Sequence, residues 1–253
     1  MNTNSNTYTV IYSVILVVVV AVVLAFTAMT LQPAQETNVK VETISKILTS
    51  VGLYDAESGM TNDQILKAYS DNIKEAVLVN AEGNVVAKNI ELKGNSYLKL
   101  QSTLIKKASE GDAAAKAEIA LPVYIFNIDG QDVPVVPCYG AGLWGPIWGY
   151  LAFEGDMNTI EGAVFDHKGE TPGLGAEIAT NWFRNNFTGK KIYNAEGEFT
   201  SVKVVKGGAA EDDINGVDAI SGGTITSQAL EKAIKSWLEA YVPYFETLKA
   251  VEE

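Results

Sequence analysis

Four hydroxyl-bearing residues and two adjacent glycines stand directly before a long apolar-periodic segment near the C-terminus. The stretch from Asp218 to Ser227 has the sequence DAISGGTITS. Glycines allow a backbone to approach a ligand closely, and the first turn of a helix directs unpaired N–H groups and the positive end of its dipole at the residues before it. These features together can hold a phosphate group, so the stretch is a candidate anion site.

A simpler interpretation of the same residues is helix capping. Thr226 and Ser227 are ordinary N-cap residues, and Asp218 is a common turn former. No Walker-type lysine follows the glycines and no G-x-G-x-x-G pattern precedes them, which argues against a nucleotide-hydrolysing loop. Local composition alone leaves both interpretations open, and the cap is the more common case.

Composition limits the available chemistry further. The 253 residues carry a formal net charge of −12, which offers no basic surface for nucleic acid. The single cysteine, Cys138, excludes an intrachain disulfide and a cysteine-rich metal site, and the single histidine, His167, disfavours a zinc or haem site. We therefore expect no nucleic-acid partner and no metal, and any redox centre must be an organic cofactor.

An apolar segment comes first among the elements that must carry this loop. Residues 10–31, VIYSVILVVVVAVVLAFTAMTL, contain no charge, and at about 1.5 Å per residue such a helix spans a hydrocarbon core of roughly 30 Å. No basic residue precedes the run, and it is longer than the apolar core of a signal peptide. It therefore predicts an uncleaved transmembrane helix after a tail of residues 1–9. Lys40 and Lys46 follow it and faintly favour a cytoplasmic main domain.

Residues 32–253 have the pattern of a single α+β domain rather than a doubly wound one. A polar linker is expected at 33–38, followed by a helix that Gly52 ends. Strand-like runs flank turns and predict three antiparallel hairpins. The hairpins centre on Gly83, Gly130 and Gly155, and helices are expected after Thr61 or Asn62, at 176–186 and after Thr226 or Ser227, with a strand at 202–205.

Three glycine-containing motifs occur in an order that resembles one protein family. DAISGGT at 218–224 resembles the D-x-x-[ST]-G-A-[ST] signature at which FMN is esterified through its phosphate to a threonine. GETPGLGAEI at 169–178 and YGAGLWGPIWGY at 139–150 resemble two further motifs of the C subunit of the Na⁺-translocating NADH:quinone reductase. With the N-terminal anchor, the resemblance covers essentially the whole chain. The chain length and the Gly-Leu-Trp-Gly segment favour this family over the related G subunit of the Rnf complex.

The resemblance implies that Thr224 is the attachment residue, its Oγ1 becoming the ester oxygen of the FMN phosphate. A separate membrane flavin transferase would make the bond, and Asp218 would help present the loop to it. Gly223 stands where the family usually has alanine; glycine is smaller and should not block attachment, but we expect a more flexible loop and less complete attachment. Backbone N–H groups and a hydroxyl would hold the phosphate: Ser221, Gly222, Gly223, Ile225, and Thr226 or Ser227.

The resemblance also implies the residues around the flavin ring, which needs an apolar slot and a few polar contacts. Lys206 matches a lysine near the ring, where a cation would stabilise the reduced anionic flavin. From the residues alone, Leu143 and Trp144 would be core residues and Lys206 a solvated surface lysine. No role follows for Glu170 or His167. The implied ring contacts are Leu143, Trp144, Thr171, Leu174 and Gly175.

The implied function is electron relay without an independent active site, so no catalytic residue is expected. FMN would accept an electron from one redox centre of a membrane complex and pass it to the next. The partners would be the other subunits of a six-subunit quinone reductase, the flavin transferase and the lipid bilayer. The flavin domain would lie on the periplasmic side of a bacterial inner membrane. Two alternatives are the flavin-carrying G subunit of an Rnf-type complex and a membrane-anchored binding domain without a cofactor.

Overall fold

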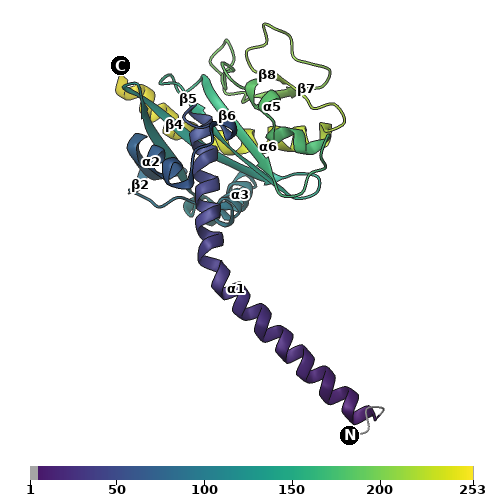
Figure 1. Ribbon diagram of the computed structural model, residues 1–253. Coiled ribbons are helices and arrows are strands. Elements are labelled where there is room, and N and C mark those ends of the chain that lie inside the picture. The colour runs from purple at the N-terminus through teal and green to yellow at the C-terminus, as the bar shows by residue number, and fades with distance from the viewer. Residues whose placement is uncertain (1–4, 253) are drawn as a thin grey trace. The chain divides into compact units, whose positions relative to one another are not determined.

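The computed structural model describes residues 5–252 (Figure 1). The chain divides into two compact units, Met1–Glu42 and Thr43–Glu253. The first helix, α1, covers Asn6–Ser50 and therefore begins within the expected tail of residues 1–9, of which residues 1–4 lie outside the described part.

Within the described residues, α1 is the one helix that is both long enough and apolar enough to cross a membrane. Its most apolar 18-residue window has a mean hydropathy of 3.0, and none of that window is buried against protein. The polar linker predicted at 33–38 is wrong, because α1 continues through it with Pro33 inside the helix. Thr37 Oγ1 donates to the Pro33 carbonyl at 2.9 Å. The residues after Pro33 are good helix formers and continue the helix, although proline has no backbone N–H group to donate.

The last turns of α1 belong to the second unit. Ile44, Ile47 and Leu48 are buried there, which matches their predicted helical spacing. Gly52 has a φ of +72° and its amide donates to the Thr49 carbonyl, so the predicted glycine stop is confirmed. The next helix, α2 at Asn62–Asn72, starts from a capping box in which Thr61 is the N-cap.

A six-stranded antiparallel sheet forms the centre of the second unit, with strand order β2-β1-β3-β4-β5-β6 (Figure 1). Each predicted hairpin is confirmed, because neighbouring strands pair across the expected glycine turns. The strands are β1 at Ile73–Asn80, β2 at Val85–Lys88, β3 at Ala120–Ile128, β4 at Gln131–Ala141, β5 at Pro146–Phe153 and β6 at Ile160–His167.

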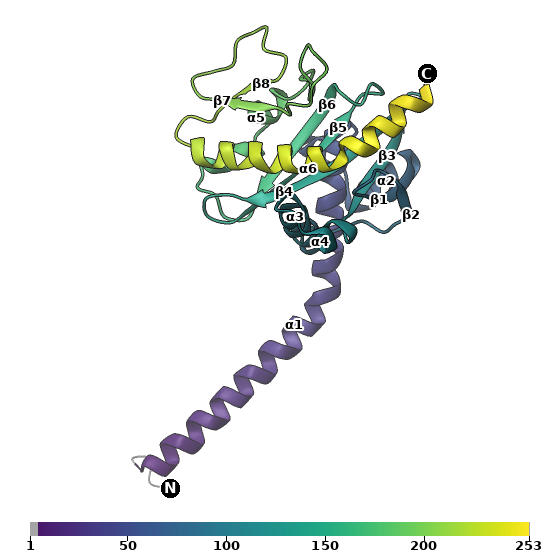
Figure 2. The same cartoon turned by 180° about the vertical axis from the view of Figure 1, so that it is seen from behind.

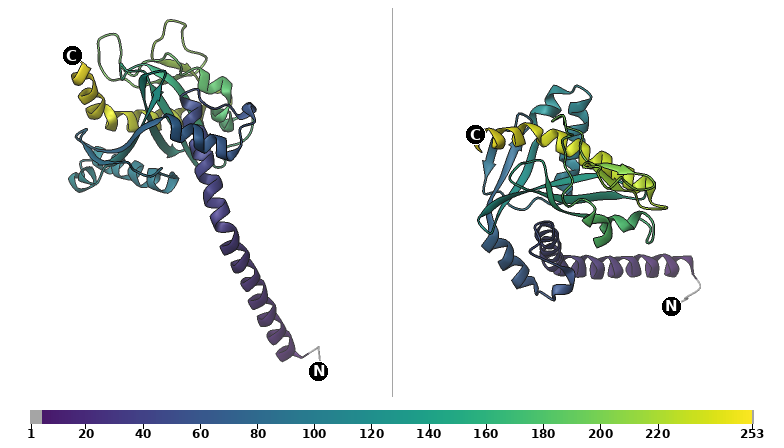
Figure 3. Two further views of the ribbon diagram at one scale, coloured as in Figure 1. Left: turned by 60° about the vertical axis from the view of Figure 1, so that its left-hand side comes forward. Right: turned by 90° about the horizontal axis from the view of Figure 1, so that it is seen from above.

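Helices cover both faces of this sheet (Figures 2 and 3). Leu121 and Val123 of β3 point into the main core with the C-terminal helix α6 at Thr224–Glu252, whereas Phe126 contacts Tyr69 of α2 with ring centroids 5.7 Å apart. Because successive side chains of a strand point to opposite faces, β3 is apolar at nearly every position. The predicted α+β class is confirmed.

Two helices on the α6 face were not expected from the sequence. They are α3 at Asn95–Ser109 and the short α4 at Ala113–Ala117. Two side-chain hydrogen bonds hold α6 against the sheet. Trp237 Nε1 donates to the Tyr139 carbonyl at 2.9 Å, and the Tyr241 hydroxyl donates to the Pro122 carbonyl at 2.7 Å. Both rings are fully buried, and burial of one such side chain contributes about 1.5–3 kcal/mol.

The segment between β6 and α6 is mostly irregular. The single helix predicted at 176–186 is wrong: a 3₁₀ helix η2 at Gly175–Ala179 ends where Thr180 becomes extended and caps the separate helix α5 at Asn181–Asn185. A short 3₁₀ helix η1 at Ala56–Ser58 precedes α2. The predicted strand corresponds to β7 at Lys203–Val205, which pairs in parallel with β8 at Gly216–Asp218.

Candidate functional site

The loop after β8 leads directly into α6, whose first helical residue is Thr224 (Figure 2). Gly223 occupies the N-cap position, because its carbonyl accepts a hydrogen bond from the Ser227 amide at 3.0 Å. Glycine has no side chain with which to cap the helix, so helix geometry leaves the amides of Thr224, Ile225 and Thr226 without an intrahelical partner. The prediction that Thr226 or Ser227 caps the helix is wrong, since both lie buried inside its first turn.

Ser227 instead fixes the loop that precedes the helix. Its hydroxyl donates to the Gly223 carbonyl at 2.9 Å and accepts the Ile220 amide at 3.2 Å. A methyl group at Gly223 would stand 2.8 Å from both Ile220 Cγ2 and the Leu174 carbonyl oxygen. Gly223 is therefore closely packed, and this conformation has no space for the alanine expected of the family at this position.

A buried glutamate, Glu170, joins three distant segments of the chain at this helix end. Its Oε2 accepts the Thr226 hydroxyl at 2.6 Å and its Oε1 accepts the Trp144 amide at 2.8 Å, while its own amide donates to His167 Nδ1 at 3.2 Å. Only 4% of Glu170 is exposed. No role for Glu170 was expected from the sequence; an acidic residue directly after glycine in a motif with only one other charged residue, Glu177, was the available signal.

Two glycines allow these segments to close around the Glu170 carboxyl group. A Cβ at Gly142 would stand 2.5 Å from Glu170 Oε1, and a Cβ at Gly175 would stand 2.5 Å from Oε2 and 2.4 Å from Thr226 Oγ1. Any larger residue would therefore displace one of the hydrogen bonds. This explains in physical terms why glycine stands at one position of each motif, Gly142 and Gly175.

The three motif segments surround a small pocket of about 120 Å³ at the start of α6. Thr224 is partly exposed, and its hydroxyl makes no hydrogen bond within the described residues. Trp144 is 69%, Ile225 60% and Leu143 49% exposed, so the expectation from the residues alone that Leu143 and Trp144 are core residues is wrong. Of the predicted site residues, the pocket brings together Leu143, Trp144, Thr171, Leu174, Gly175, Gly222, Gly223, Thr224, Ile225 and Thr226.

Three predicted residues do not line this pocket. Ser221 is exposed on the preceding turn, and Lys206 is exposed directly after β7. Asp218 accepts the Ala209 amide through Oδ1 at 2.8 Å, and so fixes the turn that leads away from β7. The structure thus gives Asp218 a local structural partner and gives Lys206 no contact with the pocket.

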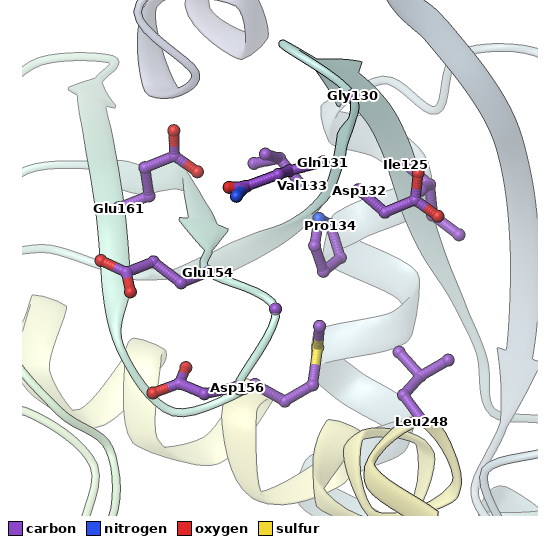
Figure 4. Close-up of a pocket in the computed structure, with 12 residues that line it drawn as sticks. Ile125, Gly130, Gln131, Asp132, Val133, Pro134, Glu154, Asp156, Glu161 and Leu248 are labelled. Carbon is purple, nitrogen blue, oxygen red and sulfur yellow. The ribbon is translucent and has the colours of Figure 1, made fainter. Parts of the chain in front are cut away.

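A larger cavity of about 840 Å³ lies elsewhere, between the β3–β4 turn, the β5–β6 turn and the end of α6 (Figure 4). It is lined by carboxyl groups, among them Glu154 and Glu161, and burial together with the Glu154 charge raises the pKa of Glu161. Cys138 lies in the core, where burial raises the pKa of its thiol to about 12, so it is protonated at neutral pH. Neither feature contacts the motif pocket.

The family model for an FMN-binding domain matches residues 142–239, which include every segment that lines the pocket. The C subunit of the Na⁺-translocating NADH-quinone reductase of Haemophilus ducreyi is 31% identical over 90% of this chain and 88% of its own length. The corresponding subunit of Pseudomonas aeruginosa is 30% identical over 94% and 93%. The chain belongs to the family of C subunits of Na⁺-translocating NADH-quinone reductases. The resemblance seen in the sequence is thereby confirmed.

Solved structures from the same family confirm the fold as well. The crystal structure of the C subunit from Parabacteroides distasonis matches with a TM-score of 0.66 and 38% identity, covering 85% of this chain and 96% of that one. The structure of the corresponding subunit from Shewanella oneidensis matches with a TM-score of 0.65 and 27% identity, covering 84% of this chain and 99% of that one. The FMN-binding domain is therefore carried by the antiparallel sheet and the helices that pack on it.

Proposed function

We propose that this chain is a covalently flavinylated electron-relay subunit in which FMN is esterified through its phosphate to Thr224. The observation that carries the proposal is that the free, partly exposed hydroxyl of Thr224 lies at the start of α6, which no side chain caps. Thr224 is the first residue of α6, and the amides of its first turn have no intrahelical partner. A phosphate group at this position would satisfy those amides and interact favourably with the helix dipole.

The same pocket supports an external transferase rather than self-modification. The side chains that line it include no histidine, cysteine or lysine among the described residues, so Glu170 is the one ionisable side chain of this lining. Glu170 already accepts hydrogen bonds on both carboxyl oxygens. Thr224 therefore needs only to be accessible, and a membrane flavin transferase would supply the chemistry.

The apolar side chains around Thr224 are suited to hold the flavin ring at the surface. The pocket volume of about 120 Å³ is below the roughly 300–1,000 Å³ of typical ligand pockets, so a ring would lie against the pocket mouth. Trp144, Leu143 and Leu174 are exposed there and offer apolar contact. FMN, when bound, supplies one-electron chemistry, and a ring at the surface is reachable by a redox partner.

The family and the apolar helix α1 support the cellular setting of this proposal. We infer a single membrane anchor in a bacterial inner membrane, a flavin domain on the periplasmic side, and the other subunits of the quinone reductase as partners. The covalent bond would prevent loss of the cofactor and keep it at the relay position. Lys206, Asp218 and Ser221 remain proposed contacts for the flavin or the transferase, although they lie outside the pocket.

Peptide mass mapping of the chain from membranes that contain the transferase tests the proposal. The peptide with Thr224 should be heavier by FMN minus one water, and fragmentation should place the increment on Thr224. A Thr224→Val variant should lose the increment, whereas Thr171→Val, which removes another hydroxyl from the same pocket, should retain it. A colourless, unmodified wild-type chain from such membranes would refute covalent flavin attachment and leave the cofactor-free binding domain as the alternative.

A further inference from the structure

A second groove lies beside the motif pocket and is separated from it only by the turn at 142–145. Leu143 and Trp144 of this turn line the pocket, whereas Gly142 and Gly145 line the groove. The groove has a volume of about 830 Å³ and runs between the N-terminal half of α3 and the adjoining ends of β4 and β5. We refer to it as the lysine groove, because Lys99 and Lys168 contribute its charged side chains.

The charge of the lysine groove is opposite to that of the chain as a whole. No aspartate or glutamate is among the described residues that line it, although the chain has a net charge of −12. Lys99 and Lys168 are both exposed, and neither forms an ion pair with another described residue. The similarly large cavity in Figure 4 shows the contrast, since carboxyl groups line it and no lysine or arginine does so in the described part.

Further donors in the lysine groove suit carboxylate groups spaced along a chain. Ser96 lies in the first turn of α3, which Gly94 caps without a side-chain hydrogen bond, so the amides and dipole of this helix add to the positive potential. Thr103 contributes a second hydroxyl further along the same helix. The half-buried Trp148 ring provides an apolar wall. Lys46, whose Nζ lies 5.5 Å from the centroid of this ring, is ion-paired with Asp166 and does not line the groove.

We propose that the lysine groove docks an acidic peptide segment of the protein that exchanges electrons with this subunit, an inference that rests on the relay function proposed above. Complementary charge raises the association rate and fixes orientation, and a segment seated here would hold its protein next to Leu143 and Trp144. An extended polyanion such as nucleic acid would be repelled by the remaining surface of a chain with net charge −12. A short acidic segment contacts only the groove.

Binding of a defined probe to the full-length chain in phosphatidylcholine nanodiscs tests the groove directly. The probe is a fluorescein-labelled octapeptide of alternating aspartate and glutamate. Its binding is measured by fluorescence anisotropy at low salt and at about 0.15 M salt. The double variant Lys99→Glu with Lys168→Glu should weaken binding at least about tenfold. The matched control, Lys106→Glu with Lys107→Glu, lies on the same helix outside the groove and should change binding less than about twofold.

The control decides between a docking site and general electrostatics, because both double variants change the net charge equally. Equal weakening in the two would overturn the proposal. Displacement of the peptide by inorganic phosphate at matched ionic strength would also overturn the proposal, in favour of a small anion. The same holds, in favour of a lipid, if the Lys99→Glu and Lys168→Glu double variant loses more of its binding to phosphatidylglycerol nanodiscs than of its binding to the peptide. The assay is run on unflavinylated chain, so its outcome is independent of whether Thr224 carries FMN.

A second measurement connects the groove to electron transfer. In the reassembled complex, the Lys99→Glu and Lys168→Glu double variant should keep wild-type flavin content but lower NADH-to-quinone turnover several-fold, and the control double variant should not. Turnover unchanged at full flavin content would refute the role in partner docking even if the peptide binds. Absence of flavin from the wild-type chain would instead refute the proposed relay function.

Discussion

Replacement of Thr226 by valine tests whether the buried carboxyl group of Glu170 organises the motif pocket. Valine has nearly the same shape as threonine and removes only the hydroxyl that donates to Glu170 Oε2 at 2.6 Å. Thr226 is 1% and Glu170 4% exposed, so water has little access to replace the donor. A buried acceptor left unsatisfied costs about 1–3 kcal/mol, and more when it is charged.

We therefore expect Thr226→Val to lower the free energy of unfolding by about 2–3 kcal/mol. At roughly 2–4 °C per kcal/mol for a domain of this size, the melting temperature should fall by roughly 4–12 °C. If Thr226 acted only as a helix cap, as its residue type suggested, the loss would be about 1 kcal/mol. The two explanations of this residue thus differ by a measurable amount.

The assay is urea unfolding of the full-length chain in detergent, followed by tryptophan fluorescence. The chain should be produced without the flavin transferase, because a bound cofactor stabilises the folded state by mass action. Thr226→Ser keeps the donor and serves as one control. Thr224→Val serves as the other, since the Thr224 hydroxyl makes no hydrogen bond within the described residues and its removal should change stability by less than about 0.5 kcal/mol.

A Thr226→Val variant as stable as Thr226→Ser would refute the structural role of this hydrogen bond. In cells that contain the transferase, the same variant should also show lower flavin content, because Glu170 would then hold only the Trp144 amide. Normal flavin content in a clearly destabilised variant would show that the buried hydrogen bond supports the fold without positioning the pocket.

Substitutions at three further positions test separate parts of the structure. Ser201 is buried with a φ of +62° and a hydroxyl that has no partner, so Ser201→Gly should raise the free energy of unfolding by about 1 kcal/mol, and Ser201→Ala by less, in thermal denaturation. Gly223→Ala should lower it by about 1–3 kcal/mol, because its methyl would meet the Leu174 carbonyl at 2.8 Å. Burial and the Glu154 charge raise the pKa of Glu161 from 4.5, so the folded state binds the Glu161 proton more tightly than the unfolded state does. The stability of the chain then falls as pH rises from 4.5 through the raised pKa of Glu161. Glu161→Gln should therefore stabilise the chain at pH 7 by less than about 1 kcal/mol, and urea titrations below pH 4.5 should show no gain in stability.

Elements whose ends are encoded locally could be predicted from the sequence. Gly83 and Gly130 adopt positive φ in the turns of two hairpins, and Gly52 does so after α1. Thr61 and Gln64 form a capping box that lies entirely within one turn of α2. Each of these features depends on residues within four positions of one another, so residue type and spacing are sufficient to predict them.

Elements that lack such local markers were missed or misplaced. The helix α3 begins at Asn95 after Gly94, an N-cap residue without a side chain, and its inward face includes the polar Gln101, whose Oε1 accepts the Ala120 amide at 2.9 Å. At 176–186 the apolar spacing suggested one helix, but Thr180 turns extended and caps a second one. At Pro33 the opposite error occurred, because the residues after it continue the helix.

The sequence motifs predicted which segments line the candidate site, but not the contacts that hold these segments together. The motifs supplied the loop residues, yet Glu170 acts on residues 26 and 56 positions away, which no local pattern reveals. The same long-range partner explains the misplaced start of α6. Thr226 has the residue type of an N-cap, but its hydroxyl donates to Glu170, and the observed N-cap, Gly223, lies three residues earlier.

The different surroundings of the three hydroxyl groups in the first turn of α6, those of Thr224, Thr226 and Ser227, explain why Thr224 is the proposed attachment residue. Thr226 and Ser227 are almost fully buried and hydrogen-bonded, one to Glu170 and the other to the Gly223 carbonyl. Thr224 lies two positions before Thr226, so its side chain points to a different side of the helix from the Thr226 hydroxyl. It is partly exposed and lines the pocket. The packing that removes two hydroxyls from solvent therefore leaves the Thr224 hydroxyl accessible at the helix start, beside free amides of the same turn that are suited to hold a phosphate.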